Sequence, residues 1–391
     1  MGTLRGQIRF LREQGFDVHV ISSPSEAAAR FVASEGASYI PVEMRREIAP
    51  LHDLRALWRL WRVLRRLRPD ICQVGMPKAG LLGGMAAWLA RVPCRVYMMH
   101  GLRLETLSGG KRVLLRWVER IACRTTHRVL CVSESLRRRA VELGIVADAR
   151  CTVLGAGSAN GVDVARFAMS ESFRAIARQV RDDLGIPKGA SVVGFVGRLT
   201  RDKGIYELVQ AFERLKKAYP QLHLLLVGPY EEGDPVPHAT RMKIVIEPRI
   251  LRVGRVDDTG PYYHAMDIVA LPSYREGLPT VVLEAGAAAK PVVGSRATGM
   301  ADAIDDGRTG LLAPVGDVAA LGERLERLLN DPAWSEEMGN AARQHVAENF
   351  RQENVWTTLA GFYHSLLPAH ASDVAPTMTR GALANSRTRS V

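Results

Sequence analysis

The sequence lacks the features that mark membrane-spanning proteins and metalloproteins. No run of about 18 apolar residues occurs in the 391 residues, and the longest apolar stretch, 79–90, is too short to be a transmembrane helix. The N-terminus shows neither the hydrophobic segment nor the cleavage site of a signal peptide. The five cysteines follow no metal-ligand spacing, and we expect them to be reduced thiols of a cytosolic protein.

The composition is that of a globular protein, but its charge is uneven. The chain is 47% hydrophobic and 24% charged, and its length predicts two domains. The formal net charge is +12, and residues 1–167 carry the whole excess, with 27 Lys and Arg against 14 Asp and Glu. Such a basic half could attract nucleic acid, an anionic membrane surface or a phosphate-bearing substrate.

Segments typical of strands and helices alternate along both halves of the chain. This alternation predicts an α/β fold built from two doubly wound parallel sheets. We expect domains at 1–167 and 191–350, an interdomain connection at 168–190, a final helix at 351–368 and a disordered tail at 369–391.

A basic amphipathic helix is expected at residues 52–68. Its arginines recur at intervals of three or four and form one face, opposite a face of Leu and Trp; they are Arg55, Arg59, Arg62 and Arg66. The simplest interpretation is a surface helix that packs on a sheet. Basic helices with Trp and Leu also favour anionic interfaces, so a membrane-surface role stays open. Nucleic acid is not an expected partner, because only Trp58 and Trp61 interrupt the basic face with aromatic rings.

Two cations follow the strand that opens the second half. Gly197 and Arg198 come directly after this strand, and Lys203 precedes the next helix. A guanidinium binds phosphate through two hydrogen bonds and an ammonium acts as a point charge, so the pair suits a diphosphate at a helix N-terminus. The loop is neither a P-loop nor the glycine-rich dinucleotide motif. The later strand that ends at Gly254 and Arg255 offers backbone groups for a base.

Two carboxylates bracket the turn at 273–280, which joins a strand to a helix. Glu276 lies in the turn, and Glu284 lies more than one helical turn further on. Ligands bind at the carboxyl ends of strands in such sheets, where helix N-termini offer free N–H groups. Gly277 permits close approach of the backbone, and Pro279 suits the first helical position. The turn therefore suits a sugar and a ribose; the alternative is an ordinary loop whose glutamate is favoured by the helix dipole.

Two residues of the first half also stand at strand ends. Lys78 is at a helix start, where it could meet an anion, and His100 precedes Gly101 at a strand terminus that could face a cleft. The alternatives are an ordinary surface lysine and a capping or core histidine.

Short segments of both halves form a specific pattern together. The second half has Gly-Arg-Leu and Lys-Gly within 197–204, Leu-Pro-Ser-Tyr-Arg-Glu-Gly-Leu-Pro with Glu-Ala within 271–285, and Gly-Arg-Thr-Gly-Leu-Leu at 307–312. The first half has Pro-Lys-Ala-Gly at 77–80, His-Gly at 100–101, Cys-Val-Ser at 131–133 and Asn-Gly-Val-Asp at 160–163. Over about residues 3–367 the sequence thereby resembles glycosyltransferase family 4, the retaining enzymes of the GT-B fold, and within it the branch that assembles capsule, O antigen and exopolysaccharide.

The resemblance implies two Rossmann-like domains that face a central cleft, with the final helix crossing back to the first domain. It implies that Arg198 and Lys203 bind the donor diphosphate and stabilise the leaving phosphate, and that Glu284 holds the ribose. Glu276 would hold the donor sugar, together with backbone N–H groups of the turn. The implied donor site comprises Gly197, Arg198, Lys203, Gly254, Arg255, Glu276, Gly277, Leu278, Pro279 and Glu284.

The resemblance also places residues on the other side of the cleft. His100 would lie near the donor sugar and the acceptor hydroxyl, so the implied catalytic residues are His100, Glu276, Arg198 and Lys203. The acceptor side would be lined by Lys78, Arg103 and the loop of Asn160.

The implied reaction moves a hexosyl or N-acetylhexosaminyl group, with retention, from a nucleotide sugar to a lipid-diphosphate-linked saccharide. UDP is the expected nucleotide. Fixed cations and a helix N-terminus meet the charge that develops on the leaving diphosphate, and no Asp-x-Asp stands at a strand end, so we expect no metal and no cofactor. Retention is implied by the family, and we favour front-face attack within an ion pair over a covalent intermediate on Glu276. The expected location is the cytoplasmic face of the membrane, with the basic half on anionic lipid.

One departure from the family pattern keeps other functions open. Members usually begin with a strand and a glycine-containing loop that faces the donor, whereas this sequence begins at the following helix. The first strand of the N-terminal domain is therefore expected to be missing: either the true start lies upstream, or the site lacks part of one wall. The main alternative is a truncated, non-catalytic relative that binds nucleotide or membrane. A UDP-sugar epimerase on a similar fold is another, and it would convert its substrate without an acceptor.

Overall fold

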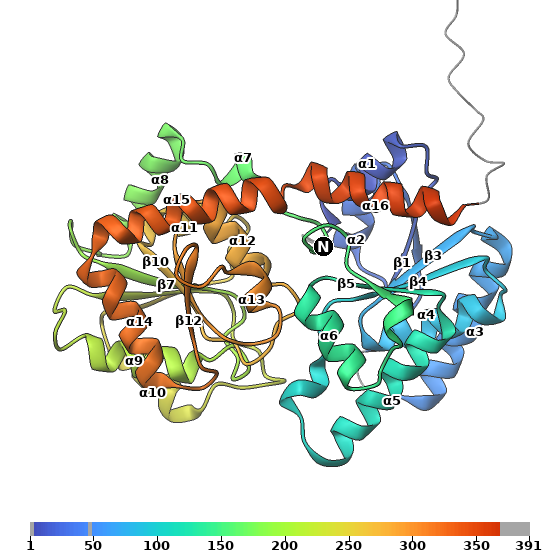
Figure 1. Ribbon diagram of the computed structural model, residues 1–391, viewed down its shortest axis with the longest axis horizontal. Coiled ribbons are helices and arrows are strands. Elements are labelled where there is room, and N and C mark those ends of the chain that lie inside the picture. The colour runs from blue at the N-terminus through green and yellow to red at the C-terminus, as the bar shows by residue number, and fades with distance from the viewer. Residues whose placement is uncertain (1–3, 46–48, 368–391) are drawn as a thin grey trace, which may run out of the picture.

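The molecule consists of two α/β halves that lie side by side (Figure 1). The structure is a computed structural model and describes residues 4–45 and 49–367. All strand pairs in its named sheets are parallel. The expected α/β class with parallel sheets is therefore confirmed, whereas the expected tail at 369–391 lies outside the described residues.

The C-terminal half is built on one six-stranded sheet in the order β12-β11-β10-β7-β8-β9. Its first two strands in sequence lie together, and the order reverses between β7 and β10, which is where ligands bind in open α/β sheets. The strands are β7 (Val192–Val196), β8 (His223–Val227), β9 (Ile250–Gly254), β10 (Ile268–Leu271), β11 (Val292–Ser295) and β12 (Gly310–Ala313).

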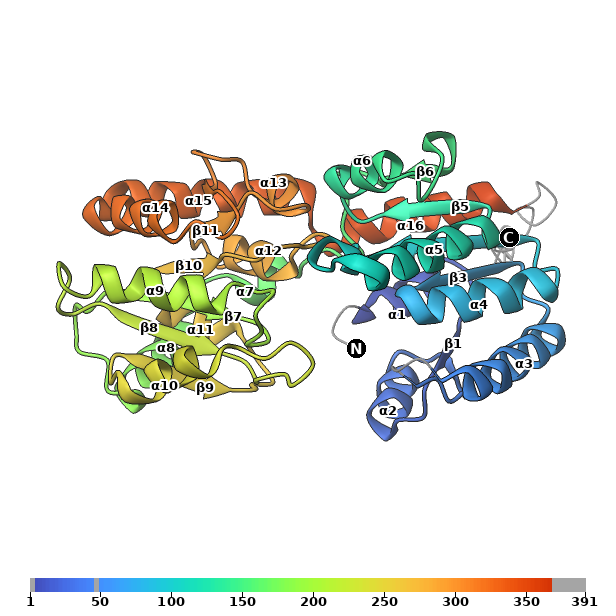
Figure 2. The same ribbon diagram turned by 90° about the horizontal axis from the view of Figure 1, so that it is seen from below.

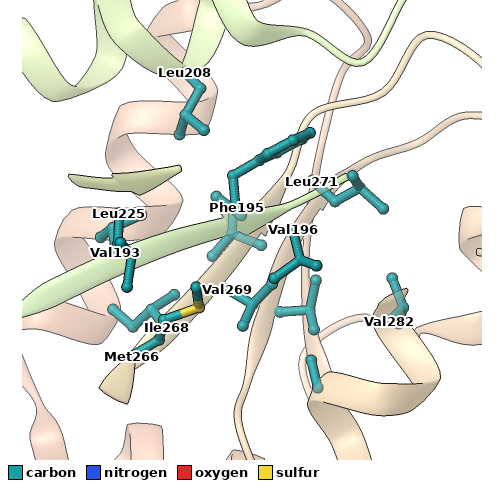
Figure 3. Close-up of a cluster of buried hydrophobic side chains, with 14 of the residues drawn as sticks. Val193, Phe195, Val196, Leu208, Leu225, Met266, Ile268, Val269, Leu271 and Val282 are labelled. Atoms are coloured by element: carbon teal, nitrogen blue, oxygen red, sulfur yellow. The ribbon is translucent and has the colours of Figure 1, made fainter. Parts of the chain in front are cut away.

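Helices cover both faces of this sheet, so its central strands are continuous apolar runs. The helices are α8 (Glu171–Asp183), α9 (Ile205–Leu215), α10 (His238–Ile246), α11 (Gly260–Ala265), α12 (Thr280–Ala287), α13 (Met300–Ala303), α14 (Val318–Asn330) and α15 (Pro332–Asn349). Figure 3 shows the core at this point, where Phe195 of β7 and Val269 of β10 are fully buried together with Leu208 of α9.

The N-terminal half differs from the expected single sheet, because its strands form two. The described chain opens on α1 (Gln7–Glu13), and β1 (His19–Ser22) pairs only with β2 (Ser38–Pro41). The other sheet has the order β3-β4-β5-β6, with β3 (Ile71–Gly75), β4 (Cys94–Met99), β5 (Arg128–Cys131) and β6 (Cys151–Thr152). Within the described residues β1 and β3 share no ladder, and both strands are only half-buried, unlike the interior of β4.

The helices of the N-terminal half alternate with these strands. They are α2 (Glu26–Ser34), α3 (Pro50–Leu67), α4 (Pro77–Leu89), α5 (Gly109–Thr125) and α6 (Glu134–Glu142), with the short elements η2 (Arg103–Thr106), η3 (Asp148–Arg150) and α7 (Val164–Phe167). None of the helices in the described ranges has the length and apolar character that crossing a bilayer requires. The five cysteines are free thiols.

The last helix, α16 (Gln352–Leu366), leaves the C-terminal half and lies along the N-terminal half beside α1 (Figure 1). The Trp356 ring packs on Phe10 with centroids 5.6 Å apart, and its Nε1 donates to Asn160 Oδ1 at 2.7 Å. Where the chain passes from one half to the other, Val162 N donates to Phe350 O at 2.8 Å. Two chain segments therefore join the halves at this point.

Candidate active site

The predicted phosphate-binding cations lie at the carboxyl end of β7. Gly197 follows the strand with a φ of 145°, and a Cβ on the neighbouring Gly228 would overlap the Gly197 carbonyl group. Both glycines therefore keep the ends of β7 and β8 close. Arg198 follows as a half-exposed guanidinium that is paired with Glu231. Lys203 lies just before α9, and its Nζ is 2.5 Å from Glu276 Oε1.

The turn after β10 is fixed by backbone hydrogen bonds from both sides. Tyr274 N donates to Asp202 O at 2.8 Å, and Glu276 N donates to Thr298 O at 3.1 Å. The first bond draws this turn toward the loop that carries Lys203. The structure thus brings together one predicted cation and one predicted carboxylate that are 73 positions apart. Pro279 is the N-cap of α12 and not its first residue, so the helix begins one position later than expected.

The ribose candidate Glu284 is half-buried on α12 and is held by a residue that sequence reasoning missed. The hydroxyl group of Tyr263 donates to Glu284 Oε2 at 2.8 Å, and Tyr263 is fully buried. Burial raises the pKa of the Glu284 carboxyl, while the Tyr263 hydrogen bond and the Arg166 guanidinium oppose that rise. No sequence pattern relates Tyr263 to Glu284, because they lie on different helices, α11 and α12.

The N-terminal half meets this site through the end of β4. His100 follows the strand, and a Cβ added at Gly277 would overlap the His100 carbonyl oxygen, so the two backbones are in close contact. Ser133 Oγ, at the start of α6, donates to Gly277 O at 2.6 Å. The His100 side chain keeps a solvent-accessible face, yet protein groups crowd the rest of it, and this partial burial lowers its pKa. The structure therefore brings His100 beside the turn that carries Glu276.

Further polar contacts join the halves near His100, and sequence reasoning found none of them. Ser135 N donates to Asp302 Oδ1 at 3.0 Å, and Thr298 Oγ1 donates to Glu105 Oε1 at 2.9 Å. Arg275 Nε donates to Thr106 Oγ1 at 3.1 Å. These contacts hold the two domains together along one side of the site.

The remaining candidates lie further from these contacts. Lys78, at the start of α4, pairs with Asp53 of α3 at 2.7 Å. Arg103 is exposed in η2, three residues after His100. The side-chain amide of Asn160 is buried and hydrogen-bonded at both ends, to Trp356 and to Arg5 O, so it holds α16 in place. Gly254 ends β9, and Arg255 follows it in solvent. The roles of these five residues toward a ligand stay predictions.

The described geometry can bind and stabilise a phosphorylated sugar. Arg198 and Lys203 place positive charge at the end of β7, where a diphosphate would also meet the first turn of α9. Glu276 and Glu284 place hydrogen-bond acceptors for hydroxyl groups on either side of the α12 start. In this structure each cation is paired with a carboxylate, so a bound diphosphate would replace Glu231 and Glu276 as their partner.

Comparison with known proteins identifies the family. Residues 3–157 match the family described as "Glycosyl transferase 4-like domain", and residues 190–331 match "Glycosyl transferases group 1". The chain is 32% identical over 366 residues to the capsular polysaccharide biosynthesis glycosyltransferase CapM of Staphylococcus aureus, covering 93% of this chain and 94% of that protein. The chain is a glycosyltransferase of family 4. This glycosyltransferase is also 24% identical over 328 residues to the Escherichia coli UDP-Gal:α-D-GlcNAc-diphosphoundecaprenol α-1,3-galactosyltransferase, covering 83% of each.

Solved structures confirm the GT-B fold of the glycosyltransferase. The Anabaena protein HepE in complex with UDP-glucose superposes with a TM-score of 0.77 at 20% identity, covering 93% of this chain and 96% of that one. Sucrose-phosphate synthase of Thermosynechococcus elongatus gives a TM-score of 0.75 at 21% identity, covering 93% and 92%. At these identities the likeness establishes the fold alone.

Proposed function

We propose that this glycosyltransferase transfers a hexosyl or N-acetylhexosaminyl group, with retention, from a UDP-sugar to a lipid-diphosphate-linked saccharide during assembly of a bacterial surface polysaccharide. The observation that carries the proposal is the contact of Lys203 with Glu276 where the loops after β7 and β10 come together, with Arg198 on the first loop and Glu284 on the helix α12 that follows the second. The names of the Staphylococcus aureus and Escherichia coli relatives support the polysaccharide, the UDP donor and the lipid-linked acceptor.

The proposed mechanism uses fixed charges in place of a metal or a cofactor. As the sugar–phosphate bond breaks, negative charge develops on the diphosphate, and Arg198, Lys203 and the first turn of α9 stabilise it. Glu276 orients the sugar hydroxyls, and the acceptor hydroxyl attacks from the same face beside His100 while its proton passes to the leaving β-phosphate oxygen. Because burial lowers the His100 pKa, its imidazole is neutral near pH 7 and can accept a hydrogen bond. We expect transfer to continue in EDTA.

The proposed acceptor is lipid-linked, so the enzyme would work as a peripheral protein on the cytoplasmic face of an anionic membrane. Helices α3, α4 and α5 lie side by side on the N-terminal half (Figure 2). On α5 the only acidic residue, Glu119, is buried, and the exposed side combines an apolar stripe with cations. The stripe is Val113, Leu114, Trp117 and Ile121, between 39% and 56% exposed, and the cations are Lys111, Arg112, Arg116, Arg120 and Arg124.

The apolar stripe and the cations on the exposed side of α5 together favour binding at the interface of anionic bilayers. We expect co-sedimentation with vesicles that contain phosphatidylglycerol, and its loss in Trp117→Glu. Val245→Glu is a matched control, because Val245 is an exposed apolar residue on α10 of the other half. Equal vesicle binding by both variants would contradict this orientation.

The test of the donor site is calorimetric titration with UDP, GDP and ADP, repeated on Lys203→Ala. Selective binding of UDP that weakens in the variant supports the proposal. If none of the three nucleotides binds, the proposal is refuted for this chain. Conversion of a UDP-sugar in the absence of acceptor would instead indicate an epimerase.

A further inference from the structure

The loop that follows β4 and carries His100 reaches the C-terminal half a second time, through η2. There Glu105 Oε1 accepts a hydrogen bond from Thr298 Oγ1 at 2.9 Å. The Glu105 side chain is only 12% exposed, and Thr298 lies just before α13 of the other half. The helices α6 and α13 also lie next to each other across the two halves (Figure 2). The contact of Glu105 with Thr298 is therefore enclosed between the halves.

Thr298 links Glu105 to the turn that carries Glu276. The carbonyl oxygen of Thr298 accepts the backbone N–H of Glu276 at 3.1 Å, while its hydroxyl group donates to Glu105. The residue after Glu105 contacts the same turn directly, because Thr106 Oγ1 accepts a hydrogen bond from Arg275 Nε at 3.1 Å. Two adjacent residues of η2 thus hold two adjacent residues of the turn, one directly and one through Thr298.

Folding stability alone does not account for a carboxylate at position 105. Glu105 Oε2 is buried, and within residues 4–45 and 49–367 it has no hydrogen-bond partner. The nearest cation, Arg139, lies 3.4 Å from Oε1 and has a second carboxylate partner in Glu142. A buried carboxylate oxygen without a partner is destabilising, and an apolar side chain of similar size would avoid that penalty. The hydrogen bond from Thr298 is therefore the feature that requires an acceptor at this position.

We propose that Glu105 is a positioning residue that sets Glu276 against the donor sugar through Thr298. This inference rests on the proposed function, because it takes Glu276 as the carboxylate that orients the sugar hydroxyls. Glu105 and His100 belong to one loop, so the segment that brings His100 to the acceptor hydroxyl also fixes the sugar-binding carboxylate of the other half. Such shared support holds reacting groups in register. Loss of Glu105 should leave the nucleotide bound and impair binding of the sugar.

The test is calorimetric titration of the full chain with UDP and with UDP-glucose, UDP-galactose, UDP-N-acetylglucosamine and UDP-N-acetylgalactosamine. The measured quantity is the Kd of the UDP-sugar that the wild type binds most tightly, divided by the Kd of UDP. Glu105→Ala should raise this ratio about tenfold or more, because a hydrogen bond to a charged group behind Glu276 is lost. Thr298→Val removes the same hydrogen bond from its other end and should raise the ratio equally. The double variant should be no worse than either single variant.

Two control variants separate positioning from packing and charge. Glu105→Gln keeps a side-chain oxygen that can accept from Thr298, so it should restore most of the wild-type ratio. Glu142→Ala removes the other carboxylate partner of Arg139, on an exposed side chain away from Thr298, and should leave the ratio unchanged. Unchanged UDP affinity in every variant shows that each is folded.

The outcomes separate this inference from the proposed function. A wild-type ratio in Glu105→Ala, with a raised ratio in Glu276→Ala, would overturn the inference and leave the sugar-binding role of Glu276 standing. Additive effects of Glu105→Ala and Thr298→Val would also overturn it, because residues that act through one hydrogen bond do not add. Absence of UDP binding by the wild type would refute the proposed function, and the inference with it.

Discussion

Replacement of Glu284 by alanine should selectively remove recognition of the ribose. The Glu284 carboxylate accepts hydrogen bonds from the Tyr263 hydroxyl, at 2.8 Å on Oε2, and from the Thr259 side chain. Its remaining lone pairs are available to a ligand. The half-buried setting strengthens a hydrogen bond from a ribose hydroxyl, because water competes less there.

The size of the effect follows from the number of hydrogen bonds lost. One hydrogen bond to a charged group contributes about 1.5–3 kcal/mol, so losing one raises the Kd of UDP roughly 10- to 150-fold. The variant also leaves the Tyr263 hydroxyl without its carboxylate partner, which costs about 1–3 kcal/mol of folding stability. A lower melting temperature is therefore expected together with the weaker binding.

Calorimetry with UDP and with its 2′,3′-dideoxy analogue separates these two effects. The wild-type protein should prefer UDP, whereas Glu284→Ala should bind both nucleotides equally weakly. Glu323→Ala, which removes an exposed carboxylate from α14, should behave as wild type. If Glu284→Ala still discriminates between UDP and the analogue, Glu284 does not hold the ribose and the reasoning is refuted.

Three further predictions concern charge, closure and pH. Arg198→Ala should weaken UDP by about 1.5–3 kcal/mol and leave UMP nearly unchanged in calorimetry, because only UDP carries the β-phosphate; equal losses would place Arg198 elsewhere. Gly277→Ala should slow transfer about 100-fold with UDP affinity retained, because its Cβ forces the turn away from the His100 carbonyl group; wild-type turnover would contradict the close approach. Burial raises the pKa of Glu119 from 4.5 to about 7, so its favourable contribution to stability is complete below pH 4.5 and is lost as pH rises through 7. Relative to wild type, the free energy of unfolding of Glu119→Gln should therefore rise by up to about 3 kcal/mol between pH 5 and pH 8 in thermal melts. A stability difference between the two proteins that does not change with pH would contradict the buried acid.

Much of the placement of the candidate donor-site residues could be predicted because a parallel sheet brings strand ends to one edge. Lys203 and Glu276 follow β7 and β10, and these neighbouring strands place their side chains 2.5 Å apart. The same logic allowed His100, at the end of β4, to face a cleft, and the structure places it beside the turn that carries Glu276. Local sequence patterns sufficed for these residues, since each stands directly at a strand terminus or helix start.

The remaining contacts of the site depend on how separate elements pack against each other, and no local sequence pattern encodes this packing. Tyr263 reaches Glu284 from another helix, and Ser133 reaches Gly277 from another domain, 144 positions away. Asn160 matched a motif, yet its amide is used to hold Trp356. The two N-terminal sheets likewise depend on strand pairing and not on the strands themselves, which were anticipated at about the right positions.

The most direct test of the account is transfer of labelled sugar from UDP-sugars to a lipid-diphosphate-linked saccharide, with the wild type beside Arg198→Ala/Lys203→Ala. The account predicts a product that keeps the anomeric configuration of the donor, formed in EDTA, and lost in the double variant. Product formed equally by the double variant, or formed only when a divalent metal is added, would contradict the claim that fixed cations at the end of β7 carry the reaction.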